Sequence, residues 1–431
     1  DERTTISRNM KKSILKFVQS LEPDKKKSPL LHTVFDGFFT FLFTPNSTTS
    51  HGVHIRDGVD LKRTMTIVVI ALQLCYLFGT LNIGHQHFVA LGQYPGLLDG
   101  LHLKIAFGLI QLLPIFAVTM LVGLGIEFYY AYKKGHSIEE GFLVTGSLIP
   151  LIMPPDIPLW ILALSVAFAV WIGKEAFGGT GMNILNIALL SRVFIFFAYP
   201  TDISGDEVWV AGLTGMQPGA LVDYGWWHTG FFNGLFETIG WATFEPGMAV
   251  VDGYTGATPL SLAYQGGWEK VASVYSESQI FWGSIPGSIG ETSKPLIILG
   301  ALLLIISGIG SWRIMLGMIF GTGVMALLLN FWGATSFMEV PWYYHYIMGS
   351  FLFAMAFMAT DPVTAASTNL GKWIYGFLIG FIGIIIRVMN PAYPEGWMLA
   401  ILFMNVFAPL IDHYVIEGNI NRRLKNQKAA I

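Results

Sequence analysis

The chain contains ten long apolar stretches, and these constrain its fold more than any other feature. Their approximate limits are 64–84, 103–130, 141–153, 157–173, 184–199, 293–311, 314–332, 343–360, 373–389 and 397–416. A helix needs about 20 mostly apolar residues to cross the hydrocarbon core of a bilayer. Only 12% of the residues are charged, which is about half the charged fraction of a soluble domain. We therefore predict an all-α polytopic membrane protein with about ten transmembrane helices.

Several of these stretches are shorter than a full span and border proline or glycine. The borders contain Pro154-Pro155-Asp156, the glycine-rich run 178–181 and Asp361-Pro362, so we expect broken helices there. The halves 64–199 and 292–416 carry such breaks in a similar order, with five spans each. An odd number would invert the second copy, and inverted repeats with broken helices typically hold a ligand near the membrane midplane. The alternative is chance similarity among proline-interrupted apolar segments.

The basic residues predict the orientation in the membrane. Residues 1–63 contain eleven Lys or Arg, and the tail 417–431 is also basic. The polar interval 200–291 has Lys270 as its single basic residue. Cytoplasmic segments are enriched in Lys and Arg. We therefore expect both termini and both basic regions in the cytoplasm, and the interval 200–291 outside.

The external interval contains the most distinctive short segment, D-G-Y-T-G-A-T-P-L-S at 252–261. Its Asp-Gly pair and Gly256 indicate a sharp bend. Thr258-Pro259 then predicts a helix start, with Thr258 as N-cap and Pro259 at the first helical position. A helix N-terminus favours a phosphate nearby. The plainer alternative is a capped surface helix without a ligand.

Five polar residues stand out within or beside the apolar stretches. Asn183 and Asn186 are three residues apart, so on a helix they would share one face; they could bind a polar ligand or bond to a neighbouring helix. Glu127, Asp361 and Asp412 are candidates for a sodium path, because ionisable groups at membrane depth are costly and usually functional. Glu127 and Asp412 could instead be interfacial residues.

The segment around Thr258 resembles the flavin-attachment motif of the family that contains the B subunit of the sodium-translocating NADH:quinone reductase and the D subunit of the Rnf complex. The resemblance covers nearly the whole chain. It continues through H-I-R-D-G-V-D-L-K-R (54–63), K-E-A-F-G-G-T-G-M-N (174–183), F-F-A-Y-P (196–200), I-P-G-S-I-G-E (285–291), M-A-T-D-P-V-T-A (358–365), R-V-M-N-P-A-Y-P-E-G (387–396) and A-P-L-I-D-H (408–413).

The resemblance implies particular site residues. Thr258 would be esterified through the phosphate of FMN. Asn183 and Asn186, with Thr145 as a further candidate, would bind a non-covalent riboflavin. The glycine-rich inner end of the second span, Gly123 and Gly125, would belong to the quinone region. Leu124 stands here where a second glycine is expected.

The resemblance also implies a function. The chain would be a redox subunit in the bacterial inner membrane that passes electrons from a neighbouring subunit's covalent FMN to FMN on Thr258, then to riboflavin and ubiquinone, coupled to Na⁺ export. NADH would be oxidised on another subunit, because this chain has no dinucleotide motif. The single cysteine, Cys75, excludes a multi-cysteine metal site. No metal site and no nucleic-acid partner are expected.

Two alternatives remain open at this point. One is the D subunit of an Rnf complex, although the long basic N-terminal segment and the extended C-terminal tail favour the quinone reductase. The other, from a different functional class, is a channel without cofactor, such as a urea-type transporter, which the inverted repeat alone would allow.

Overall fold

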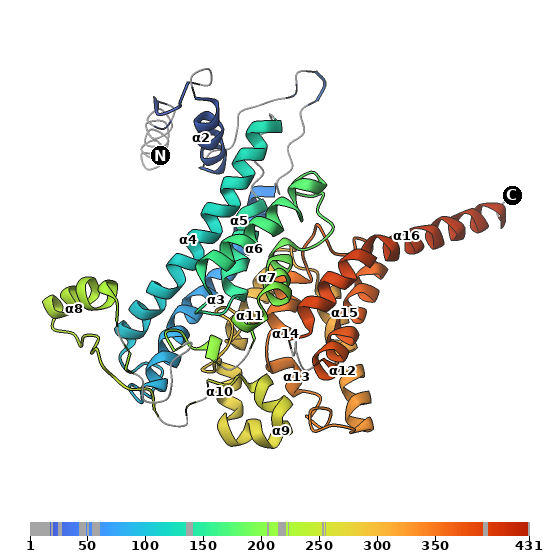
Figure 1. Cartoon of the computed structure of the whole chain (residues 1–431). Coiled ribbons are helices and arrows are strands. Elements are labelled where there is room, and N and C mark those ends of the chain that lie inside the picture. The colour runs from blue at the N-terminus through green and yellow to red at the C-terminus, as the bar shows by residue number, and fades with distance from the viewer. Residues whose placement is uncertain are drawn as a thin grey trace, which may run out of the picture.

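A computed structural model gives the three-dimensional structure of the chain (Figure 1). It describes residues 18, 20–24, 28–42, 49, 51–53, 61–134, 141–204, 207–213, 221–222, 224–251, 254, 256–390 and 395–429. Within these residues the regular structure is helical, and the only β-type pairing is an isolated bridge between Leu221 and Ala249. The predicted all-α class is confirmed.

The helices follow one another along the whole described chain. In order they are α2 (Pro29–Leu42), α3 (Leu61–Ala90), α4 (Leu101–Lys134), α5 (Gly141–Ile152), α6 (Leu159–Trp171), α7 (Ile187–Ala198), α8 (Asn233–Ile239), α9 (Pro259–Val274), α10 (Glu277–Trp282), α11 (Lys294–Ile306), α12 (Trp312–Trp332), α13 (Tyr344–Ile347), α14 (Phe351–Phe353), α15 (Asn369–Met389) and α16 (Trp397–Ala429). The short 3₁₀-helix η1 (Glu175–Phe177) and the short π-helices η4 (Trp227–Phe232) and η5 (Ala354–Met358) lie between them.

The described helices account for nine of the ten apolar stretches. Six are long and apolar enough to cross a membrane, namely α3, α4, α6 with its extension to Phe177, α12, α15 and α16. Three shorter apolar helices are α5, α7 and α11. The prediction of a polytopic membrane protein is confirmed. The expected breaks are also present, because α5 ends before Pro154, η1 ends before Gly178 and η5 ends before Asp361.

The stretch 343–360 departs from the prediction of one apolar span. It is divided into α13, α14 and the π-helical η5. Gly349, between α13 and α14, has a φ of +64°. A left-handed residue ends an α-helix because its carbonyl and amide groups leave the helical direction.

Close backbone approach holds two helix pairs together. An added Cβ atom at Gly84 or Gly108 in the α3–α4 pair, or at Gly321, Gly376 or Gly380 in the α12–α15 pair, would lie 1.9 to 2.4 Å from a carbonyl oxygen of the facing helix. Small residues allow such contact between membrane helices. These glycines therefore fix the distance between the paired helices.

The two halves of the bundle meet where α3 packs on α11 and α7 packs on α16. Arg192 of α7 donates from Nη1 to Glu291 Oε1 over 3.1 Å, just before α11. Both side chains are buried. In the same region an added Cβ at Gly79 of α3 would lie 2.2 Å from the carbonyl oxygen of Ile289. The backbone of α3 at Gly79 is therefore in close contact with the segment just before α11.

Two ends of the bundle can be distinguished. Figure 1 shows α9, α10 and α13 at one end, and α2 with the last turns of α4 at the opposite end. We call these the α9 end and the α2 end. The last turns of α16 extend away from the bundle and are mostly exposed.

Candidate functional site

Thr258 is the N-cap of α9. Its backbone is extended, with φ −72° and ψ 155°, and its Oγ1 accepts a hydrogen bond from the Ser261 N–H over 3.2 Å. Pro259 occupies the first helical position, where a proline's missing N–H costs nothing. The helix start predicted from the sequence is confirmed.

The residues around Thr258 fix its position at the α9 end. Ala257 and Leu260 are buried in a small core shared with Tyr344 and Met348, whereas Thr258 itself is half-buried. At Gly349 an added Cβ would lie 2.5 Å from Leu260 Cδ1. The Thr258 side chain is therefore held by packed neighbours and is still accessible.

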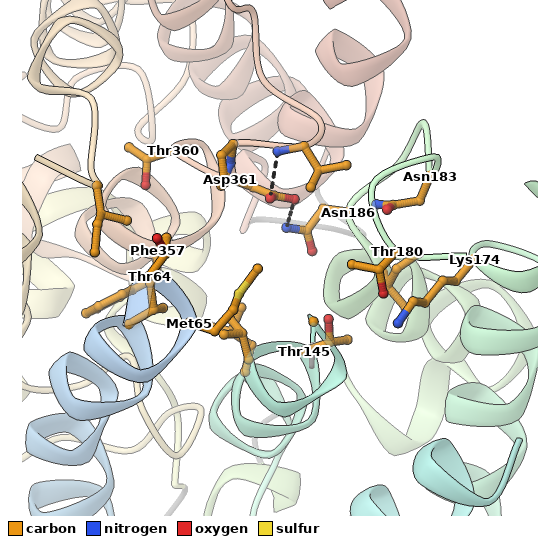
Figure 2. Close-up of a pocket in the computed structure, with 18 of the residues that line it drawn as sticks. Thr64, Met65, Thr145, Lys174, Thr180, Asn183, Asn186, Phe357, Thr360 and Asp361 are labelled. Atoms are coloured by element: carbon orange, nitrogen blue, oxygen red, sulfur yellow. Dashed lines mark hydrogen bonds between the residues drawn. The ribbon is translucent and has the colours of Figure 1, made fainter. Parts of the chain in front are cut away.

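A second candidate site is a cavity between the two halves of the bundle (Figure 2). It is lined by the start of α3, by α5, by the linker before α7 and by the segment after η5. The cavity has a volume of about 80 Å³. The space is therefore narrow.

The cavity brings four predicted residues together: Thr145, Asn183, Asn186 and Asp361. Figure 2 shows Asn186 between Asp361 on one side and Thr145 on the other. These residues come from three segments far apart in the sequence. The pocket that contains Asn183 and Asn186 therefore also contains Asp361, which we predicted for a separate ion path.

Asp361 is a well-satisfied carboxylate. Its Oδ1 accepts from the Val363 N–H over 3.1 Å, and its Oδ2 accepts from Thr364 Oγ1 over 3.0 Å and from Asn186 Nδ2 over 3.4 Å. The Thr360 hydroxyl donates to the Ala356 carbonyl of η5 instead. Thr364 therefore binds the carboxylate and Thr360 does not.

The prediction that Asn183 and Asn186 share a helix face is wrong. Asn183 lies in the linker and donates to the Leu185 carbonyl over 3.0 Å. Asn186 is the N-cap of α7, and its Oδ1 accepts from the Leu189 N–H over 3.2 Å. The glycines of the 178–181 run have φ values of +88° to +123°, which a helix does not allow. Both amides nevertheless line the same cavity.

Two residues of the cavity wall, Lys174 and Thr180, are not among the predicted site residues. Lys174 Nζ donates to Glu127 Oε1, and this ion pair is buried. Thr180 Oγ1 is buried and has no hydrogen-bond partner among the described residues. The two residues share one sequence signal. Both belong to the segment K-E-A-F-G-G-T-G-M-N (174–183), which carries part of the family resemblance.

The three carboxylates predicted for a sodium path do not gather at one place. Asp361 lines the cavity, whereas Glu127 contacts it through Lys174. Asp412 of α16 accepts from the backbone N–H groups of Ser367 and Thr368 over 2.6 and 3.0 Å. Asp412 therefore supports the start of α15.

Gly123 and Gly125 have different surroundings on α4. Gly123 is buried, and an added Cβ would lie 1.8 Å from Phe142 Cζ. Gly125 is exposed and has nothing within 4 Å of its added Cβ. Nearby, an apolar groove between α3, α4 and α5 is lined by residues that include Phe116, Met120 and Leu143. Sequence reasoning did not predict this groove.

Among the residues that the structure describes, no group of three His, Cys, Asp or Glu side chains could hold a metal ion. Cys75 is buried. The polar groups of the two candidate sites are hydroxyls, amides, one lysine and carboxylates. These groups suit an organic ligand with hydrogen-bonding edges, or a cation that prefers oxygen ligands.

Comparison with known proteins identifies relatives over most of the chain. The chain is 42% identical over 417 residues to the B subunit of the Na(+)-translocating NADH-quinone reductase of Chromohalobacter salexigens, covering 92% of both chains. It is 42% identical to the protein of that name from Ectopseudomonas mendocina and 43% identical to that from Stutzerimonas stutzeri, covering 91% of this chain and 93% of each relative. A model of the NQR2, RnfD, RnfE family matches residues 48–421, and the chain therefore belongs to this family.

Proposed function

We propose that the chain is the membrane flavoprotein subunit of a Na⁺-translocating NADH:ubiquinone reductase. In this proposal it carries electrons from a neighbouring subunit's FMN, through FMN on Thr258 and a riboflavin, to ubiquinone, and the transfer is coupled to Na⁺ export. The single observation that carries the proposal is the N-cap position of Thr258 on an accessible helix start, in a chain whose relatives bear that enzyme's name.

Thr258 fits attachment of a phosphate. Its hydroxyl oxygen already lies at the positive end of α9, where free N–H groups and the helix dipole stabilise negative charge. Packing of Leu260 against Gly349 holds the helix start in place. An attached FMN would supply one- and two-electron redox chemistry, while Thr258 and the start of α9 bind and orient its phosphate.

The cavity between the halves fits the polar edge of a riboflavin. Asn183, Thr145 and Lys174 supply donors and acceptors, and the unpartnered hydroxyl of Thr180 lines the same space. Buried polar groups are normally hydrogen-bonded, so the unpartnered Thr180 hydroxyl supports a ligand here. Asn186 would act indirectly, because its amide already caps α7 and donates to Asp361.

Sodium and quinone sites are part of the same proposal. Asp361 and Thr364 provide oxygen atoms beside the cavity, with Glu127 and Asp412 as further carboxylates of the path. The groove between α3, α4 and α5 is apolar enough for an isoprenoid tail. Gly123 packs on Phe142 of α5, and Gly125 lies two residues further along α4 on its exposed surface.

We propose the cytoplasmic orientation of both termini in the bacterial inner membrane on the charge distribution. Residues 1–63 and 417–431 would be cytoplasmic, and 200–291 would lie outside with Thr258. The inverted repeat of 64–199 and 292–416 is supported by matching neighbours: α4 packs on α6 as α12 packs on α15, and α6 packs on α7 as α15 packs on α16.

Partners follow from the same assignment. The chain would work within a multi-subunit complex in which other subunits oxidise NADH and carry a further FMN. The family description includes RnfD, so the D subunit of an Rnf complex is the nearest alternative. The quinone reductase is favoured, because two relatives of that name are 42% identical over 91–92% of this chain.

The first experiment tests for covalent flavin. The purified complex is denatured, and flavin fluorescence is measured on this polypeptide after electrophoresis. Cleavage after Tyr254 and Tyr264 then gives the peptide 255–264 for mass spectrometry. We expect an FMN adduct on Thr258, retained in Thr255→Ala. An adduct on Thr255, or a native polypeptide without flavin, would contradict the proposal; the second result would favour a cofactor-free channel.

A further inference from the structure

An exposed apolar surface lies on the segment 226–241, which contributes no residue to the cavity between the halves. It contains five large side chains that are 46 to 65% exposed: Trp226, Trp227, Phe231, Leu235 and Ile239. We call these five side chains the outer face of α8. So many exposed aromatic and aliphatic groups on one short segment indicate an interaction surface.

The outer face of α8 is one of two apolar sides of a continuous helical segment formed by η4 and α8. Trp227, Phe231, Leu235 and Ile239 recur every four residues, which places them along one side. The other side packs on α4. There the ring of His228 lies 5.4 Å from that of Phe107. Burial lowers the pKa of His228, so an uncharged ring faces α4.

The contacts with α4 set the depth of this segment. His102, in the first turn of α4, lies 5.0 Å from the rings of both Phe236 and Trp241, and Phe107 lies in the second turn. The 34 residues of α4 span about 51 Å, whereas the hydrocarbon core is about 30 Å thick. Figure 1 shows α8 beside the end of α4 rather than beyond it. The segment therefore lies where a membrane-spanning α4 meets the bilayer surface.

We propose that the outer face of α8 inserts into the lipid interface at the α9 end of the bundle. Its composition fits this occupant: tryptophan is enriched at membrane interfaces because its ring is apolar and its N–H is polar. The first two turns of α4 also carry exposed apolar side chains, since Leu101 and Ile105 are 39% and 38% exposed.

Charge excludes electrostatic adhesion as the mechanism. Residues 221–251 contain three acidic residues and no Lys or Arg, so they have nothing to attract anionic headgroups. Binding must come from partition of apolar and aromatic groups. We therefore expect insertion to be independent of the charge of the lipid.

Insertion would fix the height of the segment that leads to Thr258. The Val251 N–H donates to the Ala90 carbonyl at the end of α3 over 3.0 Å, and the Tyr254 N–H donates to the Val251 carbonyl over 3.2 Å. Thr258 follows four residues later. The inserted segment and the end of α3 would therefore fix the position of residues 251–258, which lead into α9.

The test uses spin labels on the full-length protein in lipid nanodiscs. Cys75, the single cysteine, is replaced by alanine, and a nitroxide is attached at Leu235→Cys. Glu237→Cys, which is exposed on another side of α8, is the matched control. We expect the label at 235 to collide mainly with oxygen dissolved in lipid, and the label at 237 mainly with a water-soluble nickel chelate.

Two results would overturn the proposal. Equal access of both labels to the nickel chelate would place the outer face in water. A label at 235 that is shielded from both reagents would show that protein covers it. A second label at Ile239→Cys, one turn further along, must behave like the label at 235. Both depths should be the same in phosphatidylcholine with and without phosphatidylglycerol, and insertion that requires the anionic lipid would contradict the mechanism.

Discussion

The surroundings of Thr258 and the cavity between the halves are built in opposite ways. Thr258, its cap bond to Ser261 and Pro259 lie within four consecutive residues. The cavity draws on positions from Thr64 to Val363, and its central hydrogen bond joins Asn186 to Asp361 across 175 positions of the sequence. The first arrangement is local, whereas the second exists only after the two halves have packed.

This difference teaches which part of a site can be changed independently. A local cap depends on its own turn of helix, so a substitution there should leave distant packing unaltered. In the cavity, one side chain serves several elements. Asn186 caps α7 and also binds Asp361, so its substitution changes a helix start and the inter-half contact together.

The largest expected effect tests that independence at Thr258. Thr258→Ala should abolish covalent FMN on this chain, because no hydroxyl remains to be esterified, while riboflavin recovered by acid extraction stays at the native amount. Both flavins are quantified by absorbance and chromatography on the same sample. Loss of riboflavin in this variant would show that the two sites are coupled and would break the comparison.

The next effect concerns the buried pair beside the cavity. Lys174→Met removes the cation that pairs with the buried Glu127 carboxylate, which should lower stability by about 3–5 kcal/mol. Thermal unfolding of the purified protein measures this. Adding Glu127→Gln should recover most of the loss, and Lys174→Arg should lose less than Lys174→Met. An unchanged unfolding temperature in Lys174→Met would mean that the pair is not formed in the protein.

A smaller effect separates two glycines of α4. Gly123→Ala places a methyl group against the buried Phe142 ring, and overpacking of this kind costs about 1–3 kcal/mol. Gly125→Ala meets open space, so its change should be within about 0.5 kcal/mol. Unfolding temperature and quinone reduction should both fall in the first variant only. Equal effects of the two would contradict the packing described for Gly123.

The smallest effect concerns sodium. Asp361→Asn keeps the shape of the side chain and removes its charge, so the half-saturating Na⁺ concentration for quinone reduction should rise several-fold with flavin content preserved. Asp412→Asn should in addition lower stability, because Asp412 also supports the start of α15. An unchanged sodium requirement in Asp361→Asn would remove this residue from the ion path.

The sequence predicts much of the fold because its main signals are local. Apolar length predicts the membrane helices, and the Thr-Pro pair predicts the start of α9. The break at Gly349 has no such signal, since a glycine inside an apolar run is also common in continuous membrane helices. The prediction that Asn183 and Asn186 share a helix face is based on their three-residue spacing. It fails because the positive-φ glycines just before Asn183 keep the backbone out of a helix.

Long-range features of the candidate site could not be predicted. The pairing of Lys174 with Glu127 joins positions 47 residues apart, and the contact of Gly123 with Phe142 depends on how α4 and α5 cross. Thr180 lies in a segment that carries the family resemblance, but its unpartnered hydroxyl is recognised only once its burial is known. Spacing along the chain carries no information on such distances.

The glycine contacts and the Arg192–Glu291 pair have a mechanical consequence. Because backbones touch within the α3–α4 and α12–α15 pairs, sliding inside either pair is sterically blocked. The two halves of the bundle are in close contact near Gly79 of α3, which faces Ile289 just before α11, and the Arg192–Glu291 pair lies in the same region. Thr64, at the rim of the cavity, lies fifteen residues away along α3, or about 22 Å. If the two halves tilt by a few degrees about the contact at Gly79, the cavity width at Thr64 changes by about 1 to 2 Å. This change is enough to admit or expel a small ion, while the contact at Gly79 barely moves.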